Sequence, residues 1–149
     1  MPIDVLSETA IRRPRDEVSA YACDPDNATS WYRNIVAVDW ETPPPLGVGS
    51  RLAFVARFLG RRMAYTYEVT ELMPGVRFVM ATRDEASFPM ETTYEFQDAP
   101  DGGTTMRLRN RGGPARYTGL LARFMGRMVR RANRQDLARL KKLLEGRAP

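Results

Sequence analysis

Apolar and polar residues alternate with a period of two over seven segments of the chain, which is the pattern of half-buried strands. In the second segment, Val36, Val38 and Trp40 share one face. Short turns such as Pro74-Gly75 separate the later segments, and parallel strands would need long crossovers, so we expect antiparallel pairing. The predicted strands cover residues 3–11, 35–42, 51–59, 62–72, 76–82, 88–97 and 104–110.

Three stretches lack this alternation and predict helices. Two short helices follow the first strand: Pro14 suits the first position of one, and Asp24-Pro25 begins the other. The third covers residues 116–145, between Pro114 and Gly146. Only this helix is long enough to cover the apolar face of the sheet. The pattern therefore predicts an α+β fold, in which a curled antiparallel sheet of about seven strands wraps around a long C-terminal helix.

The long helix has an apolar side and a basic side when residues are placed about 100° apart. Phe124 and Met128 are expected to point toward the sheet. We expect a cavity between sheet and helix, with Trp31 and Tyr32 at its mouth. The candidate ligand-binding residues are the aromatic, methionine and threonine side chains on the inward positions: Trp31, Tyr32, Phe54, Phe58, Tyr65, Tyr67, Phe78, Met80, Met90, Thr92, Tyr94, Phe124 and Met128.

Length and composition narrow the possible classes. The 149 residues predict a single domain, residues 1–149, with an ordinary hydrophobic fraction of 43%. No apolar run is long enough to cross a membrane, and the N-terminus does not resemble a signal peptide. The single cysteine, Cys23, fits a reducing cytoplasm. The absence of histidine excludes His-based triads and zinc centres. We therefore expect a cytoplasmic protein with no metal and no cofactor.

The positive charge is concentrated in the long helix. The net charge is +5, but residues 116–145 hold nine Arg or Lys against two acidic residues. A solvated outer face explains this, and weak contact with an anionic surface is the alternative. No aromatic residue lies among the arginines to stack on bases, so no specific nucleic-acid partner is expected. The basic side consists of Arg116, Arg123, Arg127, Arg130, Arg131 and Arg134.

Several phrases of the sequence resemble the START-like helix-grip superfamily (SRPBCC), and in particular its bacterial polyketide cyclase/dehydrase-like branch. The resemblance implies the helix-grip fold over nearly the whole chain. It also implies a cavity, in which members commonly bind lipids, sterols, polyketides or other apolar molecules, and some catalyse cyclisation or dehydration. The phrases are Asp24-Pro25-Asp26-Asn27 with Trp31-Tyr32, Pro45-Leu46-Gly47-Val48-Gly49-Ser50, Phe58-Leu59-Gly60-Arg61-Arg62, Tyr67-Glu68-Val69-Thr70-Glu71-Leu72 with Pro74-Gly75, and Gly102-Gly103-Thr104-Thr105.

The inward residues and the resemblance are compatible with two functions. The first is binding of a small hydrophobic or aromatic ligand, lipid- or polyketide-like, between the sheet and the C-terminal helix. The alternative is a cofactor-free polyketide cyclase or dehydrase. For it a tyrosine would hold or protonate an enolate oxygen and an asparagine amide would donate to that oxygen. The sequence leaves open whether a reaction occurs, which ligand binds, and the oligomeric state. The catalytic candidates are Tyr65, Tyr67, Tyr94 and Asn110.

Overall fold

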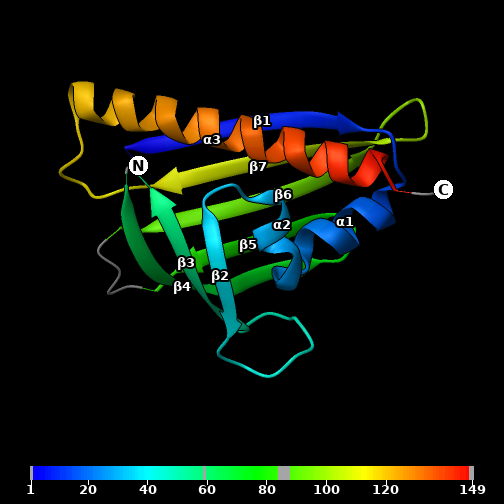
Figure 1. Ribbon diagram of the computed structural model, residues 1–149, viewed down its shortest axis with the longest axis horizontal. Helices are drawn as coiled ribbons and strands as arrows, with labels where there is room; N and C mark the ends of the chain where they lie inside the picture. The colour runs from blue at the N-terminus through cyan, green and yellow to red at the C-terminus, as the bar shows by residue number, and fades with distance from the viewer. Residues whose placement is uncertain (1, 59, 84–87, 148–149) are drawn as a thin grey trace.

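A curled seven-stranded sheet wraps around a long C-terminal helix in the computed structural model, which describes residues 2–58, 60–83 and 88–147 (Figure 1). Every neighbouring pair of strands is antiparallel, in the order β1-β7-β6-β5-β4-β3-β2. The strands are β1 (Ile3–Ile11), β2 (Ile35–Trp40), β3 (Arg51–Phe58), β4 (Arg61–Met73), β5 (Arg77–Thr82), β6 (Met90–Asp98) and β7 (Thr104–Gly112).

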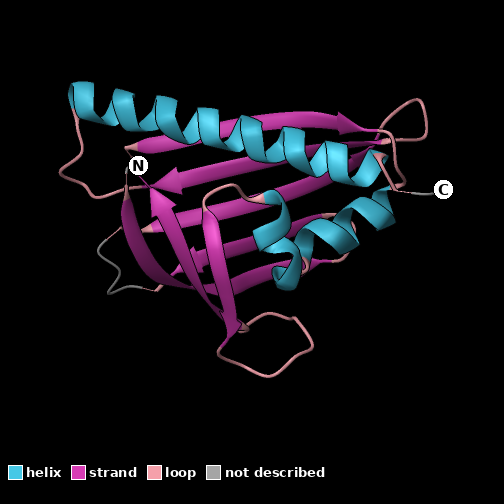
Figure 2. Cartoon of the chain, in the orientation of Figure 1, coloured by secondary structure: helices cyan, strands magenta, loops and turns pink. Residues whose placement is uncertain are grey.

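The helices lie together on one side of the sheet (Figure 2). They are α1 (Arg15–Cys23), a 3₁₀ turn η1 (Pro25–Asn27), α2 (Ala28–Trp31) and α3 (Gly119–Glu145). The side chain of Asp24 accepts a hydrogen bond from the Asp26 amide at 3.0 Å, which satisfies an otherwise unpaired donor at the start of η1. None of the helices among the described residues is both long and apolar enough to cross a bilayer.

The helix α3 begins at Gly119, three residues later than predicted. Thr118 has an extended backbone, with φ of −133°, and Gly119 has a left-handed φ of +56°, which favours glycine. The peptide N–H of Tyr117 bonds to the carbonyl of Pro114 at 2.9 Å, so the preceding residues form a turn. The turn carries the chain from the end of β7 to the start of α3.

The strand β2 departs from the predicted alternation. Its register with β3 shifts between Ile35 and Ala37, where a bulge exchanges the two faces of the strand. As a result Ile35 is buried, while Val36 is 44% exposed. The prediction that Val36 shares a face with Val38 and Trp40 is therefore wrong. Leu59, where the next predicted strand ends, lies outside the described residues.

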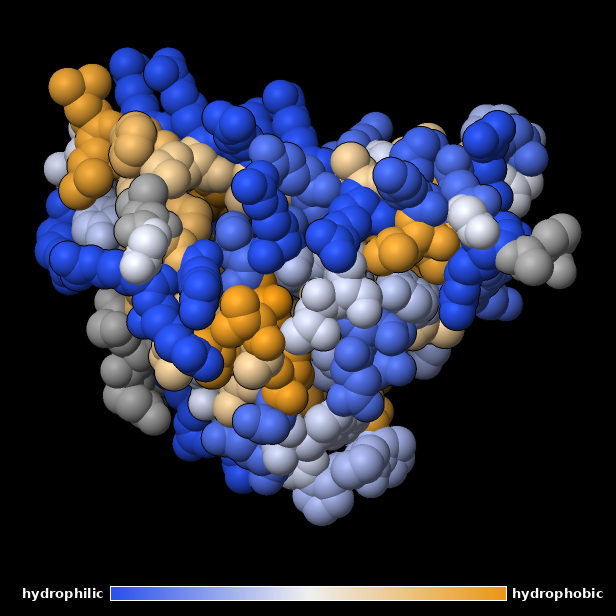
Figure 3. All heavy atoms as spheres, in the orientation of Figure 1, coloured by the Kyte–Doolittle hydropathy of each residue, from blue (hydrophilic) through white to orange (hydrophobic). Residues whose placement is uncertain are grey.

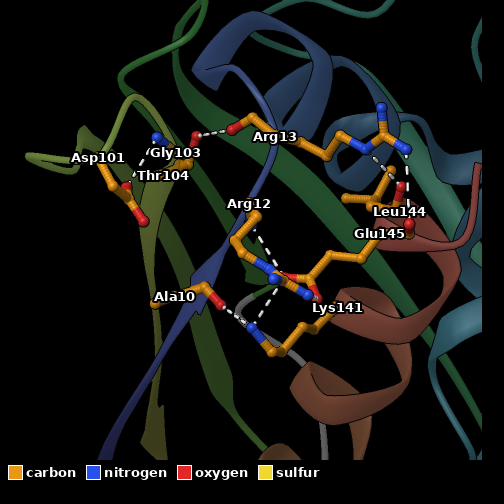
Figure 4. A network of polar contacts seen from close by, with 9 residues as sticks. All are labelled: Ala10, Arg12, Arg13, Asp101, Gly103, Thr104, Lys141, Leu144 and Glu145. Atoms are coloured by element: carbon orange, nitrogen blue, oxygen red, sulfur yellow. Dashed lines mark hydrogen bonds and ion pairs between the residues drawn. The ribbon is translucent and has the colours of Figure 1, made fainter. Parts of the chain in front are cut away.

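The C-terminal end of α3 is fastened to the segment that joins β1 to α1 (Figure 4). The Arg12 amide donates to the Glu145 carboxylate at 2.9 Å, and the Arg13 guanidinium donates to the Leu144 carbonyl at 2.9 Å. Lys141 also donates to Glu145, at 2.8 Å. These contacts hold α3 across the sheet in the helix-grip arrangement, and the predicted order of strands and helices is confirmed.

Candidate functional site

A cavity of about 1110 Å³ lies between the concave face of the sheet and α3. Small-molecule sites typically enclose about 300–1,000 Å³, so this space is large enough for one small molecule. Its wall comes from the segment 22–35, from strands β2 to β7, and from residues 116–136. Most of the lining is apolar, and the polar groups are gathered at a few positions.

Aromatic rings from β3 and β4 form one wall of the cavity. Phe54 and Tyr65 are paired across the two strands, and their ring centroids are 5.6 Å apart in a stacked arrangement. Tyr67 follows on the same face of β4, with its ring 5.2 Å from that of Tyr65 and at a steep angle to it. Each ring limits the movement of the next, so this wall is formed before any ligand arrives.

A chain of four hydrogen-bonded side chains connects β4 to α3. The Tyr67 hydroxyl lies 2.8 Å from the Thr92 hydroxyl, which donates to the Asn110 amide oxygen at 2.7 Å. The Asn110 amide nitrogen then donates to the Asn133 amide oxygen at 3.0 Å. Thr92 has one hydroxyl hydrogen and gives it to Asn110, so Tyr67 must be the donor to Thr92.

The two ends of this chain remain available to a ligand. The Tyr67 oxygen keeps lone pairs that can accept a hydrogen bond. At the other end, the Asn133 amide nitrogen is buried and has no hydrogen-bond partner among the described residues. An unpaired buried donor costs about 1–3 kcal/mol, so an acceptor from a bound molecule would be stabilised here.

A second tyrosine pair lies in the same cavity. The hydroxyls of Tyr32 and Tyr94 are 2.5 Å apart, and burial holds the pKa of both well above the usual range. Burial likewise raises the pKa of Tyr67 to about 12 and that of Tyr65 further. All four hydroxyls are therefore protonated and uncharged at neutral pH.

Asp136 is the one carboxylate of α3 that faces the cavity. Its side chain is 3% exposed and accepts a hydrogen bond from the Arg33 amide at 2.9 Å. Burial raises the pKa of Asp136 to about 6, because the charged form loses hydration, although Arg33 and Arg139 oppose the shift. The cavity thus holds a carboxyl group that can change protonation near neutral pH.

Residues 2–145 match the family described as polyketide cyclase / dehydrase and lipid transport. The chain belongs to this family. No curated protein matches the sequence. Membership fixes the general class, which includes both carriers of apolar molecules and cyclases, without choosing between them.

Solved structures of other proteins have the same fold. The protein TTHA0849 from Thermus thermophilus has a TM-score of 0.78 at 20% identity, over 93% of this chain and 94% of that chain. A START superfamily protein from Mycobacterium smegmatis has a TM-score of 0.71 at 14% identity, over 96% and 94%. The di-domain ARO/CYC BexL from the BE-7585A biosynthetic pathway has a TM-score of 0.76 at 19% identity, over 95% of this chain and 46% of BexL.

The cavity of this family member brings together most of the residues predicted from the sequence. Trp31 is fully buried in the core instead, because its ring packs against those of Tyr32 and Tyr94, with centroids 4.1 and 5.7 Å away. Met128 is half-buried and is not part of the lining. The predicted residues that do line the cavity are Tyr32, Phe54, Phe58, Tyr65, Tyr67, Phe78, Met80, Met90, Thr92, Tyr94, Phe124 and Asn110.

The inward face of α3 is rotated from the predicted one. Met125 and Leu140 are buried, whereas Phe124 lines the cavity but is 55% exposed. One step along a helix turns the side chain by about 100°, so the neighbour of an inward residue points elsewhere. The leucines at the end of α3 fix which face is turned inward. The expectation that Met128 lines the cavity is corrected, whereas Phe124 lines it although more than half of its side chain is exposed.

Asn133 and Asp136 were not among the residues predicted from the sequence. Both are polar residues at the helical spacing of the buried leucines of α3, and that position among apolar residues was the available signal. Among the described residues, no three Cys, Asp or Glu side chains come together as a metal site would require. The buried and half-buried polar groups that bear on function are therefore the tyrosine hydroxyls, Thr92, Asn110, Asn133 and the carboxyl group of Asp136.

Proposed function

We propose that the protein binds one small hydrophobic or aromatic molecule in the cavity between the sheet and α3. The observation that carries the proposal is the aromatic-lined space of about 1110 Å³ with its fixed chain of polar side chains. A mostly apolar pocket with a few well-placed polar groups is the usual form of a small-molecule site. Membership in a family that includes lipid transport supports the same interpretation.

The polar chain narrows the chemistry of the ligand. Tyr67 offers an acceptor and Asn133 offers an unpaired donor, so a matching ligand carries a hydroxyl group and a carbonyl group on an otherwise apolar or aromatic frame. Thr92 holds these two ends in place. Thr92→Val keeps the shape but removes the hydroxyl, and should weaken binding of a keto-phenol more than binding of a plain hydrocarbon probe.

The existence of a usable cavity is tested by filling it. Ala132 lines the cavity from α3, whereas Ala138 lies on the exposed side of the same helix. Ala132→Trp should leave the free energy of unfolding nearly unchanged and abolish binding of the neutral probe N-phenylnaphthylamine, whose fluorescence rises in apolar surroundings. Ala138→Trp is the matched control and should bind the probe as the wild type does.

Two results would contradict the proposal. If the space is closed core, Ala132→Trp should lose about 1–3 kcal/mol of stability, the usual result of overpacking. If the wild type never binds an apolar probe and native mass spectrometry of fresh protein finds no retained molecule, the cavity has no ligand of this class.

The second candidate is a cofactor-free cyclase, and the carboxyl group of Asp136 favours it. A base with a pKa of about 6 is suited to removing a proton from carbon next to a ketone at neutral pH. The enolate carbon would then attack a second carbonyl of the same substrate, and the new alkoxide would take a proton from a tyrosine hydroxyl. Tyr65, Tyr67 and Tyr94 are protonated and line the same cavity.

Catalysis and simple binding predict different responses to Asp136→Asn and to Tyr→Phe. If Asp136 or one of the tyrosines is catalytic, the variant should lower turnover of a poly-β-ketone substrate by roughly 10²–10³-fold with little change in affinity. Equal and small losses of turnover and affinity would indicate that these residues contribute to binding and not to catalysis.

The cellular setting is also a proposal. Cys23 is a free, partly buried cysteine, and burial raises the pKa of its thiol to about 12. Such a thiol stays protonated and unreactive, which is compatible with the reducing cytoplasm expected from the sequence. A mass measurement showing Cys23 oxidised or capped in protein isolated from cells would contradict this setting.

A further inference from the structure

The arginines of this protein fall into two groups that differ in their partners. On the outer face of the sheet, arginines are neutralised across the strands: Arg107 pairs with Glu8 at 3.0 Å, and Arg109 pairs with Asp4 at 2.7 Å. Such cross-strand pairs leave little net field at that surface. The arginines of α3 are arranged differently.

The first half of α3 presents arginines with no acidic partner. Its arginines are all exposed, and none makes an ion pair or side-chain hydrogen bond within the described part of the chain. No carboxylate lies in α3 before Asp136. These uncompensated charges are Arg123, Arg127, Arg130 and Arg131.

Exposed apolar side chains lie beside these arginines. Leu120 is 82% exposed, Leu121 46% and Phe124 55%, so three large apolar residues are gathered within five positions. Figure 3 shows apolar atoms (orange and tan) at the end of the molecule where α3 begins, bordered by hydrophilic atoms (blue). An apolar patch rimmed by charge commonly marks an interaction surface.

The hairpin that joins β3 to β4 adds to the basic charge. Arg57 lies directly opposite Arg62 in the pairing of the two strands, and both are exposed. Like charges at directly opposed positions are unfavourable, and an external anion would relieve the repulsion. Arg61, next to them, lines the cavity together with Leu121 and Phe124 of α3.

We propose that the start of α3 and the β3–β4 hairpin dock on an anionic lipid bilayer, with the cavity opening toward the membrane. The docking face consists of Leu120, Leu121, Phe124, Arg57, Arg61, Arg62, Arg123, Arg127, Arg130 and Arg131. Docking would allow an apolar molecule to pass between bilayer and cavity without crossing water, a role that rests on the proposed binding function.

Charge and shape together select a bilayer as the partner. Unpaired arginines around protruding leucines and phenylalanine are the composition of a helix that lies in the membrane interface: arginines meet the headgroups while apolar side chains enter below them. Nucleic acid would engage the arginines but would gain nothing from Leu120 or Phe124. A second copy of the chain would bring the same uncompensated positive charge against itself.

The test measures flotation with vesicles of phosphatidylcholine alone and with vesicles containing added phosphatidylglycerol, at low and high salt. The wild type should float only with the anionic vesicles, and less at high salt because charge is screened. Each basic residue near an anionic surface contributes about five-fold in partitioning, so R123Q/R127Q should weaken binding by roughly 25-fold. R107Q/R109Q removes the same charge from the sheet and should change binding less than about two-fold.

The apolar contribution has its own matched pair. Leu120→Ser with Phe124→Ser should release the protein from anionic vesicles, whereas Val48→Ser with Met73→Ser should not. Val48 and Met73 are 69% and 50% exposed, but Val48 precedes β3 and Met73 ends β4, so both lie at the end of these strands opposite the β3–β4 hairpin. Binding of N-phenylnaphthylamine without vesicles is measured in parallel, and R123Q/R127Q should retain it because Arg123 and Arg127 do not line the cavity.

Several results would overturn the docking proposal: no flotation of the wild type, equal flotation without phosphatidylglycerol, or equal losses in R123Q/R127Q and R107Q/R109Q. Binding to duplex DNA without binding to vesicles would assign the face to nucleic acid. A dimer that dissociates on Leu120→Ser would assign it to a second copy. If the protein binds anionic vesicles but not N-phenylnaphthylamine, the proposed cavity function is contradicted and the docking proposal is supported.

Discussion

The two halves of α3 differ in how deeply their side chains are buried and in how many polar contacts they make with the rest of the protein. In residues 133–145, Leu137, Leu140 and Leu144 are almost completely buried. Glu145 accepts a hydrogen bond from the Arg12 amide, and Lys141 donates to the Ala10 carbonyl. In residues 119–132, Met125 alone is buried, and no side chain makes a hydrogen bond or ion pair within the described ranges.

This difference follows the position of the cavity. Residues 121–136 of α3 contribute to its lining, whereas the leucines of the last turns pack into the main core. A helix that covers an open space forfeits the packing and polar contacts that a core would supply. One helix therefore serves both as part of the core and as one wall of a site, and the comparison between its halves can be tested.

The largest expected effect comes from removing the same side chain in each half. Leu140 is 0% exposed and Leu120 is 82% exposed. Leu140→Ala should lower the free energy of unfolding by about 2–5 kcal/mol, while Leu120→Ala should change it by less than about 0.5 kcal/mol. Chemical denaturation measures both, and equal losses would show that α3 is packed evenly along its length.

The next effect is a dependence of the free energy of unfolding on pH, which arises from Asp136 near the boundary between the two halves. The pKa of Asp136 rises from 3.8 to about 6 on folding, so the folded state holds the proton more tightly and stability falls as pH rises between these values. Asp136→Asn keeps an oxygen for the Arg33 amide and removes this loss. Relative to the wild type, the variant should therefore gain roughly 3 kcal/mol between acidic and neutral pH.

Denaturant melts of the wild type and Asp136→Asn across this pH range measure the gain. A constant difference between the two proteins at every pH would mean that Asp136 keeps its ordinary pKa, and it would remove the base required by the cyclase mechanism.

A smaller effect of opposite sign is expected at the end of α3. Lys141 and then the Arg12 amide lower the pKa of Glu145 from 4.5 to about 2, so its stabilisation is present above 4.5 and is lost as pH falls through the lower value. Glu145→Gln should reduce stability at neutral pH by about 1 kcal/mol or less, because solvent screens these contacts.

The matched change in the other half is Arg127→Gln, which removes a charge with no partner among the described residues and should leave the melt unchanged. If Glu145→Gln also has no effect at neutral pH, the contacts drawn in Figure 4 do not fasten the helix.

The fold was predictable because turns and alternation are local properties. Pro74-Gly75 and the apolar positions of β4 are visible in the sequence itself, and the strands form where they indicate. The bulge at Ile35 and Val36 was not predictable, since it depends on how β2 meets β3. The alternation gave no sign that one residue would be left out of the pairing.

The site was predictable as a set of strand residues and less so on the helices. Successive side chains of a strand point to opposite faces of the sheet, so each position has only two possible directions. This alternation places Tyr65, Tyr67 and Thr92 on the inward face. Which face of a helix is buried depends on what the helix packs against. The leucines near Leu140 pack into the core, and with this orientation of α3 Met128 does not line the cavity. In the sequence, Asp136 counts only as a charged residue of the long helix. Its burial could not be predicted, because it depends on a contact with the distant Arg33.

The central claim is that the first half of α3 covers a binding cavity, which extends to Asn133 and Asp136, and that the leucines of the second half belong to the core. The decisive measurement is hydrogen exchange of the α3 amides, with and without saturating N-phenylnaphthylamine. We expect faster exchange over residues 119–132 than over 133–145, and slower exchange of the first half when the probe is bound. Uniform exchange along α3 that the probe does not change would contradict the claim.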